Sequence, residues 1–119
     1  MLYVIRHGKT DWNLQNKIQG RADIPLNNLG IQEAKQTKEL LKQTKFYEII
    51  SSPLMRAKKT AEIISNHKTP IMTDFRLIER DFGEFEGINK KEFDSYSFWD
   101  YTLNNQYIKA ESVQQLLRV

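Results

Sequence analysis

Two arginines and one histidine stand where the residue pattern changes from strand to loop or helix. The apolar run Leu2 to Ile5 ends in Arg6-His7-Gly8, and Arg56 follows Ser52-Pro53-Leu54-Met55 at the start of a helical pattern. Arginine forks bind phosphoryl groups through paired hydrogen bonds, and a neutral imidazole can attack phosphorus. These residue types predict a phosphate pocket with His7 as the nucleophile between Arg6 and Arg56.

Phosphoryl transfer to a histidine also needs a proton for the leaving oxygen. Glu79 follows a third strand-like segment, so we expect it to be the general acid and, once ionised, the base that activates water. Each residue has a simpler explanation when taken alone. A single Arg-His-Gly can arise by chance, Ser-Pro before a helix is an ordinary cap, and one glutamate is usually solvated.

The elements that must position these residues alternate between strand and helix. We expect strands at residues 2–6, 48–51 and 70–73, with the first buried. One helix should run from about Leu29 to Gln43, capped by Asn27 or Asn28. A second helix should run to about Asn66, with Ser52 as its cap and Pro53 at its first position. Long loops are expected at 9–27 and 82–87, a weakly helical stretch at 88–109 and a helix start at Glu111.

Alternation of this kind predicts an α/β fold with a mostly parallel sheet and helical crossovers. Loops at the carboxyl ends of parallel strands converge on one crevice, where ligands bind. Arg6-His7-Gly8 and Ser52 to Arg56 should therefore face the same crevice. The free amides and dipole of the second helix should favour an anion there.

Composition narrows the class of protein. The chain has 119 residues, 39% of them hydrophobic and 28% charged, which suits a single globular domain. No apolar run approaches the roughly 20 residues of a membrane-spanning helix, so we expect no membrane contact and a cytoplasmic location. There is no cysteine, and the net charge of +3 comes from scattered lysines. We therefore expect no metal, no cofactor and no nucleic-acid partner.

Several segments in their order resemble the motifs of the histidine phosphatase superfamily, also called phosphoglycerate mutase-like. Arg6 to Asn13 resembles the opening motif, and Gln19 to Leu26 the next block. Ser51 to Ala57, followed by Thr60-Ala61, resembles the block with the second arginine. Leu77 to Gly87 resembles the block with the acid, and its Phe82 to Gly87 part is more similar to the phosphatases than to the mutases.

The resemblance implies a three-layer α/β/α fold and a role for each matching residue. His7 would be phosphorylated, Arg6 and Arg56 would bind the phosphoryl group, and Glu79 would be the general acid. Asn13, Gln19 and Gly20 would line the substrate side. The implied substrates are small phosphomonoesters such as sugar phosphates, with inorganic phosphate as a further ligand. Mutase-type transfer and non-catalytic phosphate binding on the same fold are the alternatives, and an unrelated α/β domain is a weaker one.

The family pattern also contains a second histidine in a later His-Gly pair, which this sequence does not contain. The other histidine of the chain is His67, which we expect to be exposed at the end of a helix. From this we expect residues 1–119 to form one incomplete domain with its C-terminal part missing and with impaired catalysis. In the family fold the missing strand lies between residues 2–6 and 48–51. Exposed sheet edges at that gap should favour self-association.

Overall fold

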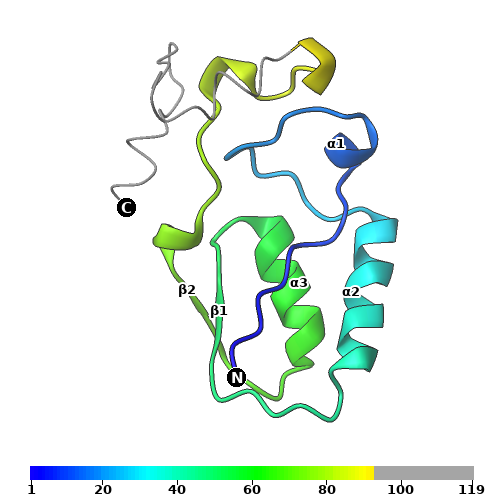
Figure 1. Cartoon of the computed structure of the whole chain (residues 1–119), viewed down its shortest axis with the longest axis vertical. Helices are drawn as coiled ribbons and strands as arrows, with labels where there is room; N and C mark the ends of the chain where they lie inside the picture. Colours follow the sequence, from blue (N-terminus) through cyan, green and yellow to red (C-terminus); the bar gives the residue numbers. More distant parts are fainter. Residues whose placement is uncertain (93–119) are drawn as a thin grey trace. The chain divides into compact units, whose positions relative to one another are not determined.

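The computed structural model describes residues 1–92, which divide into two units (Figure 1). Unit 1 consists of Met1–Asp11 and Asp23–Ile78, and unit 2 consists of Trp12–Ala22 and the residues that follow Ile78. The helical stretch expected up to residue 109 falls largely outside the described residues, and the helix start at Glu111 lies wholly outside them. A single domain over residues 1–119 stays a prediction.

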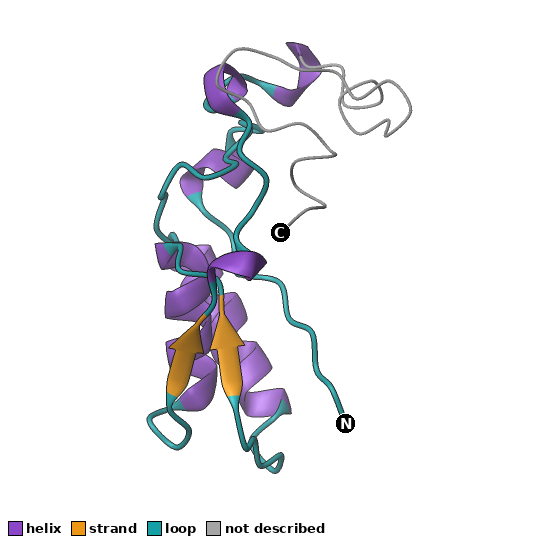
Figure 2. Cartoon of the chain, turned by 90° about the vertical axis from the view of Figure 1, so that its left-hand side faces the viewer, coloured by secondary structure: helices purple, strands orange, loops and turns teal. Residues whose placement is uncertain are grey.

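Unit 1 is built on a β-α-β motif with a parallel strand pair (Figure 2). Strand β1 (Ile49–Ser51) pairs with β2 (Ile71–Thr73) in the register Ile49 to Ile71, and helix α3 (Met55–Ser65) connects the two strands. Parallel neighbours need such a crossover because a tight turn can join only antiparallel strands. The predicted α/β class with a parallel sheet is confirmed.

Helix α2 (Asn28–Leu40) has the cap that the sequence predicts. The Asn27 side chain accepts a hydrogen bond of 2.8 Å from the Gly30 amide, which would otherwise lack a partner at the helix start. Ala34 lies on the buried side of the helix and is 1% exposed. Helix α3 packs against both strands, α2 packs against α3, and both helices lie behind the sheet in Figure 2. The described part of unit 1 thus has a sheet layer and a helix layer.

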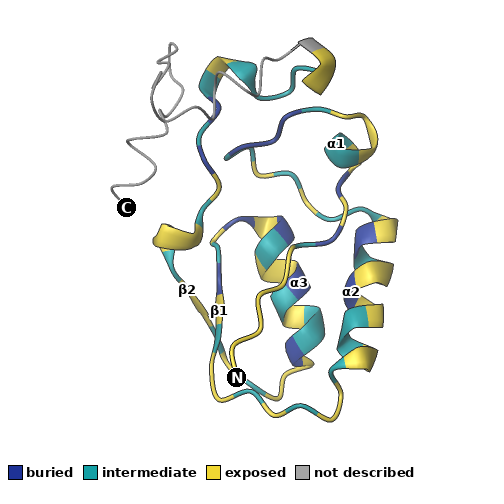
Figure 3. Ribbon diagram, viewed as in Figure 1, coloured by how far each residue is buried: buried dark blue, intermediate teal, exposed yellow. Residues whose placement is uncertain are grey.

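The expected buried strand at residues 2–6 is a wrong prediction for the described residues. This segment is extended but belongs to no strand ladder, and Leu2 and Val4 are 86% and 87% exposed. Figure 3 shows it as an exposed ribbon. The physical reason is that a strand needs hydrogen-bonded neighbours, and within residues 1–92 β1 pairs with β2 alone. The Tyr3 ring of this segment packs edge-on against the ring of Phe46.

Unit 2 is held by backbone contacts between its two chain segments. Lys17 and Asn89 form an isolated antiparallel bridge, the Ile18 amide donates to the Ile88 carbonyl over 2.9 Å, and the Gly87 amide donates to the Ile18 carbonyl over 2.7 Å. Ile18 is buried at the centre of these contacts. The short helices η2 (Gly83–Phe85) and η3 (Lys90–Glu92) belong to this unit, and η1 (Phe75–Leu77) to unit 1.

A four-residue helix, α1 (Asp11–Leu14), interrupts the stretch that the sequence predicts as a long loop. Among residues 1–92 no helix combines the length and the apolar character that a bilayer crossing requires.

Candidate active site

His7 is held by its own neighbour. Its Nδ1 lies 2.6 Å from the carbonyl oxygen of Gly8, and the side chain is half-buried. Because a carbonyl oxygen only accepts hydrogen bonds, Nδ1 must carry the proton, and the lone pair of the neutral ring lies on Nε2. A ring fixed in this tautomer has Nε2 as its nucleophilic atom.

The backbone at Gly8 is tied to helix α3 through a buried hydroxyl. The Gly8 amide donates to Thr60 Oγ1 over 3.2 Å, and the same hydroxyl donates to the Arg56 carbonyl over 2.7 Å. Thr60 is 5% exposed, so water competes little for these bonds. One side chain thus connects the residue after His7 with the helix turn that bears Arg56.

Gly8 also lies against the first turn of α2, where a larger residue would not fit. A Cβ atom on Gly8 would lie 2.4 Å from the Gly30 carbonyl oxygen, and one on Gly30 would lie 2.1 Å from the Lys9 carbonyl oxygen. The two glycines therefore permit a backbone-to-backbone approach that brings the segment of His7, Gly8 and Lys9 onto α2.

The start of α3 differs from the prediction. Leu54 is the N-cap and Pro53 precedes the helix, whereas the sequence places Pro53 at the first helical position. The Met55 amide donates to the Asp23 carboxylate over 2.7 Å, and Ser52 Oγ accepts from the Leu54 amide over 3.3 Å. Asp23 supplies the anion that the helix dipole favours, so this amide is not available to a phosphate.

The two predicted phosphate-binding arginines lie in different environments. Arg56, in the first turn of α3, is 2% exposed, whereas Arg6 ends the extended segment 2–6 and is exposed. A joint clamp by Arg6 and Arg56 stays a prediction.

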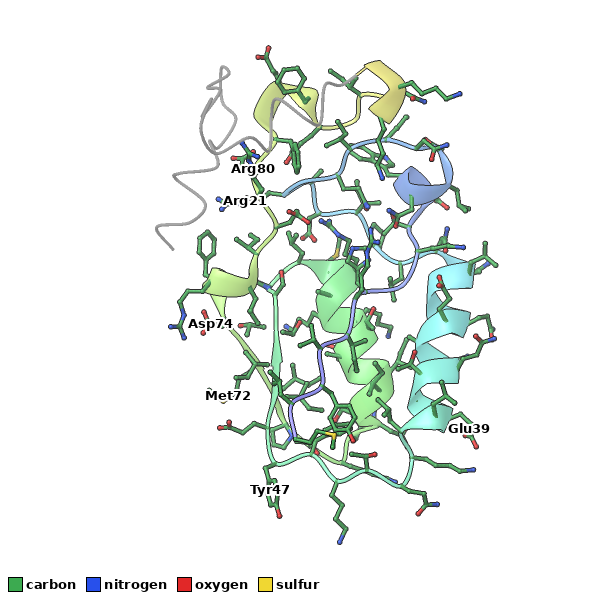
Figure 4. All side chains as sticks on the ribbon, viewed as in Figure 1. Arg21, Glu39, Tyr47, Met72, Asp74 and Arg80 are labelled. Carbon is green, nitrogen blue, oxygen red and sulfur yellow. The ribbon has the colours of Figure 1, made fainter. Side chains whose placement is uncertain are left out.

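Glu79 belongs to unit 2 and is exposed. Its carboxylate accepts a hydrogen bond of 2.7 Å from the Arg80 amide, and its backbone carbonyl accepts one of 3.0 Å from Arg21 Nε. The Arg21 amide in turn donates to the Glu86 carboxylate. Arg21 and the buried Arg80 are labelled in Figure 4. The segment bearing Glu79 is thus fixed by contacts from Arg21.

The predicted substrate-side residues Asn13, Gln19 and Gly20 also belong to unit 2. Asn13 is half-buried on α1, whereas Gln19 and Gly20 are buried. Gly20 has φ of 54°, and a Cβ atom there would lie 2.3 Å from Glu86 Oε1. The left-handed φ and these close neighbours therefore disfavour a larger residue at this position, and the role of Gly20 toward a substrate stays a prediction.

His67 is exposed, as the sequence predicts, and follows the left-handed cap residue of α3. Among residues 1–92 no group of three or more histidines, aspartates or glutamates is arranged to hold a metal ion.

Four positions that contact these segments were not predicted as functional candidates: Asp23, Thr60, Arg21 and Glu33, whose carboxylate accepts a hydrogen bond from the Lys9 amide. Three of them, Arg21, Asp23 and Thr60, lie inside the motif segments, and Thr60 is separated from Gly8 by 52 residues in sequence. Only the three-dimensional arrangement reveals such long-range polar contacts.

The parallel β-α-β motif, with His7 and Arg56 joined by one chain of hydrogen bonds, defines the class as an α/β protein. The chain belongs to the histidine phosphatase superfamily (branch 1), whose family model matches residues 2–118.

Both phosphatases and phosphoglycerate mutase-like proteins are among its relatives. It is 50% identical over 92 residues to the uncharacterized phosphatase PhoE of Bacillus subtilis, a match covering 75% of this chain and 47% of that protein. It is 43% identical over 86 residues to the probable phosphoglycerate mutase GpmB of Proteus mirabilis, covering 71% and 40%.

A solved structure of phosphoserine phosphatase from Entamoeba histolytica, in complex with 3-phosphoglyceric acid, is similar with a TM-score of 0.69 and 38% identity. The match covers 78% of this chain and 47% of that one. The chain thus spans less than half the length of each of these three proteins.

Proposed function

We propose that the protein hydrolyses small phosphomonoesters through a phosphohistidine on His7. The observation that carries the proposal is the 2.6 Å hydrogen bond from His7 Nδ1 to the Gly8 carbonyl, which directs the lone pair to Nε2. An imidazole fixed in this way loses little freedom when it attacks phosphorus, so the orientation contributes directly to the rate.

The reaction has two steps. In the first, Nε2 attacks phosphorus, the N–P bond forms and the ester P–O bond breaks, while protonated Glu79 gives its proton to the leaving oxygen. In the second, ionised Glu79 takes a proton from water, whose oxygen attacks phosphorus and breaks the N–P bond. Inorganic phosphate leaves, and both residues return to their starting states.

In this proposal Arg6 and Arg56 bind the phosphoryl oxygens, and Asn13, Gln19 and Gly20 line the substrate side. Charge stabilisation by arginine supplies what the transferring group needs, so the scheme uses no cofactor and no metal. The buried position of Arg56 supports its role, because a charge in a low-dielectric site acts strongly on a bound anion.

The substrate class rests on what the relatives bind. Phosphoserine and 3-phosphoglyceric acid occur in the Entamoeba structures, and both are small phosphomonoesters. Mutase-type transfer to a second hydroxyl is the alternative that the similarity to GpmB favours. Non-catalytic phosphate binding is the remaining alternative on this fold.

Labelling separates these functions. With a ³²P-labelled phosphomonoester, we expect the label to remain on the alkali-quenched protein, to be absent from His7→Ala and to persist in the matched control His67→Ala. Glu79→Gln should slow turnover strongly. Phosphate binding without label would support the non-catalytic alternative, and label passing to an added alcohol rather than to water would support transfer.

We further propose that a polypeptide of residues 1–119, assayed by itself, turns over slowly. His67 is exposed beyond the end of α3, so it does not supply the second histidine of the family pattern. Losing one charge-stabilising donor costs about 10²- to 10³-fold in rate. A rate equal to that of the B. subtilis PhoE protein under the same conditions would contradict this.

The location and the assembly also belong to the proposal. We propose a cytoplasmic protein that self-associates through the exposed apolar segment at residues 2–5. Leu2 and Val4 are 86% and 87% exposed, and an unpaired apolar strand-like segment is a ready template for pairing with another chain.

A further inference from the structure

The peptide bond between Gly8 and Lys9 has a hydrogen-bond partner on each side. Its carbonyl oxygen accepts from His7 Nδ1 at 2.6 Å, and its N–H, which belongs to Lys9, donates to Glu33 Oε1 at 3.1 Å. No peptide bond in the described chain is cis, so this C=O and N–H point in opposite directions. The imidazole, the peptide and the carboxylate therefore form one continuous chain of hydrogen bonds.

We propose that Glu33 is a positioning residue for His7 and acts through this peptide. The proposal rests on the proposed function for its kinetic consequences but not for the geometry. By accepting from the Lys9 amide, the carboxylate fixes the plane of the peptide and polarises its carbonyl, which makes the Gly8 oxygen a better acceptor for His7 Nδ1. The result is a ring held in the tautomer that places its lone pair on Nε2.

The neighbouring contacts of Thr60 and Asn27 are made with the peptides on either side of the Gly8–Lys9 peptide. Thr60 accepts from the Gly8 amide, which belongs to the preceding peptide, and the Asn27 amide donates to the Lys9 carbonyl over 3.0 Å, which belongs to the following one. Glu33 binds the N–H of the one peptide whose carbonyl oxygen contacts the imidazole.

Glu33 is exposed on α2, so water replaces part of its effect when the side chain is removed. We therefore expect a kinetic effect of about three- to tenfold, which is the rate equivalent of one net hydrogen bond. Glu33→Gln keeps an acceptor oxygen without the charge and should restore the rate to within about twofold. Glu39→Ala is the matched control, because Glu39 is an exposed glutamate on the same helix that pairs with Lys42.

The decisive readout is the tautomer of His7, measured by ¹⁵N NMR on histidine-labelled full-length chain at a pH where the ring is neutral. We expect the Nδ1–H form to dominate in the wild type, Glu33→Gln and Glu39→Ala, and the other tautomer to become populated in Glu33→Ala. A parallel assay with p-nitrophenyl phosphate should show kcat reduced in Glu33→Ala, with KM within about twofold of the wild type.

An unchanged tautomer in a folded Glu33→Ala variant would overturn the proposal, as would a Glu33→Gln variant as impaired as Glu33→Ala. Absence of turnover in the wild type would instead refute the proposed function, while the NMR result would still decide the role of Glu33. Backbone amide spectra of Glu33→Gln that match those of the wild type would show that the segment is folded in this variant.

Discussion

Residues 2–5 and residues 7–10 are neighbours in sequence but differ in how the structure holds them. The first segment is apolar, yet Leu2 and Val4 are almost fully exposed. The second contains polar and glycine residues, yet Gly8 and Thr10 are buried and the backbone is bound by Thr60, Glu33 and Asn27. Apolar character leads to burial only where a neighbouring element covers the segment, whereas specific polar contacts can fix a segment by themselves.

The close approach of the second segment to α2 gives the largest expected effect on folding. Replacing Gly30 by alanine should raise helix stability by about 1 kcal/mol on propensity alone. A Cβ atom there would lie 2.1 Å from the Lys9 carbonyl oxygen, so the backbone must move. We expect a net loss of about 1 to 3 kcal/mol in the free energy of unfolding, measured by urea denaturation. A more stable Gly30→Ala variant would contradict the packing of residues 7–10 on α2.

Arg6 lies between the two segments, and Arg56 is connected to the second one through Thr60, so these arginines test the comparison at the level of phosphate binding. Arg56→Ala removes a charge-assisted contact worth about 1.5 to 3 kcal/mol, so phosphate affinity measured by calorimetry should fall at least tenfold. In Arg6→Ala the phosphate affinity should fall less, because Arg6 is exposed to water whereas Arg56 is only 2% exposed. Unchanged affinity in a folded Arg56→Ala variant would exclude Arg56 from the site.

A charged residue introduced into residues 2–5 tests whether this segment is exposed. Val4 is 87% exposed, so Val4→Lys should change the free energy of unfolding by less than about 0.5 kcal/mol, whereas a buried strand would lose several times more. The same substitution should weaken self-association, measured by light scattering across a concentration series. A wild-type protein that stays monomeric and melts cooperatively would contradict the proposed pairing of residues 2–5.

The sequence predicts well those features that depend on near neighbours. The Asn27 cap needs only the amide of Gly30, three residues away, and the strand at β1 needs only a short β-branched run. The exposed position of His67 follows from its place after a helix. Such features are decided within about one turn or one strand, so pattern and propensity are enough.

Features that depend on distant partners could not be predicted. The Met55 amide at the start of α3 binds Asp23, 32 residues earlier, whereas the local sequence pattern favours Ser52 as the cap and Pro53 as the first helical residue. The burial of residues 2–6 depended on a sheet neighbour, which residues 1–92 do not provide. The roles of the candidate site residues stay predictions from the motifs, whereas the hydrogen bonds from Gly8 to Thr60 and from Lys9 to Glu33 could be found only from the fold.

The smallest expected effect comes from a polar contact that has short distances but is exposed. Asp74 and Arg76, which follow β2, form an ion pair with an Nη2 to Oδ2 distance of 2.6 Å, and Asp74 is labelled in Figure 4. Hydrogen bonds from the Arg76 side chain, and then from its backbone amide, lower the pKa of Asp74 from 3.8 to about 2. Because the folded pKa is the lower one, the contact stabilises the fold fully above about pH 3.8, and this contribution is lost as the pH falls through about 2.

We expect Asp74→Asn to be slightly less stable than the wild type in urea at pH 6 and equal to it below pH 2. A difference that persists at the lowest pH would mean that Asp74 acts through its shape as the cap of η1 rather than through its charge. The short distance matters less than the exposure because water and salt screen the pair, whereas they scarcely reach the hydroxyl of Thr60.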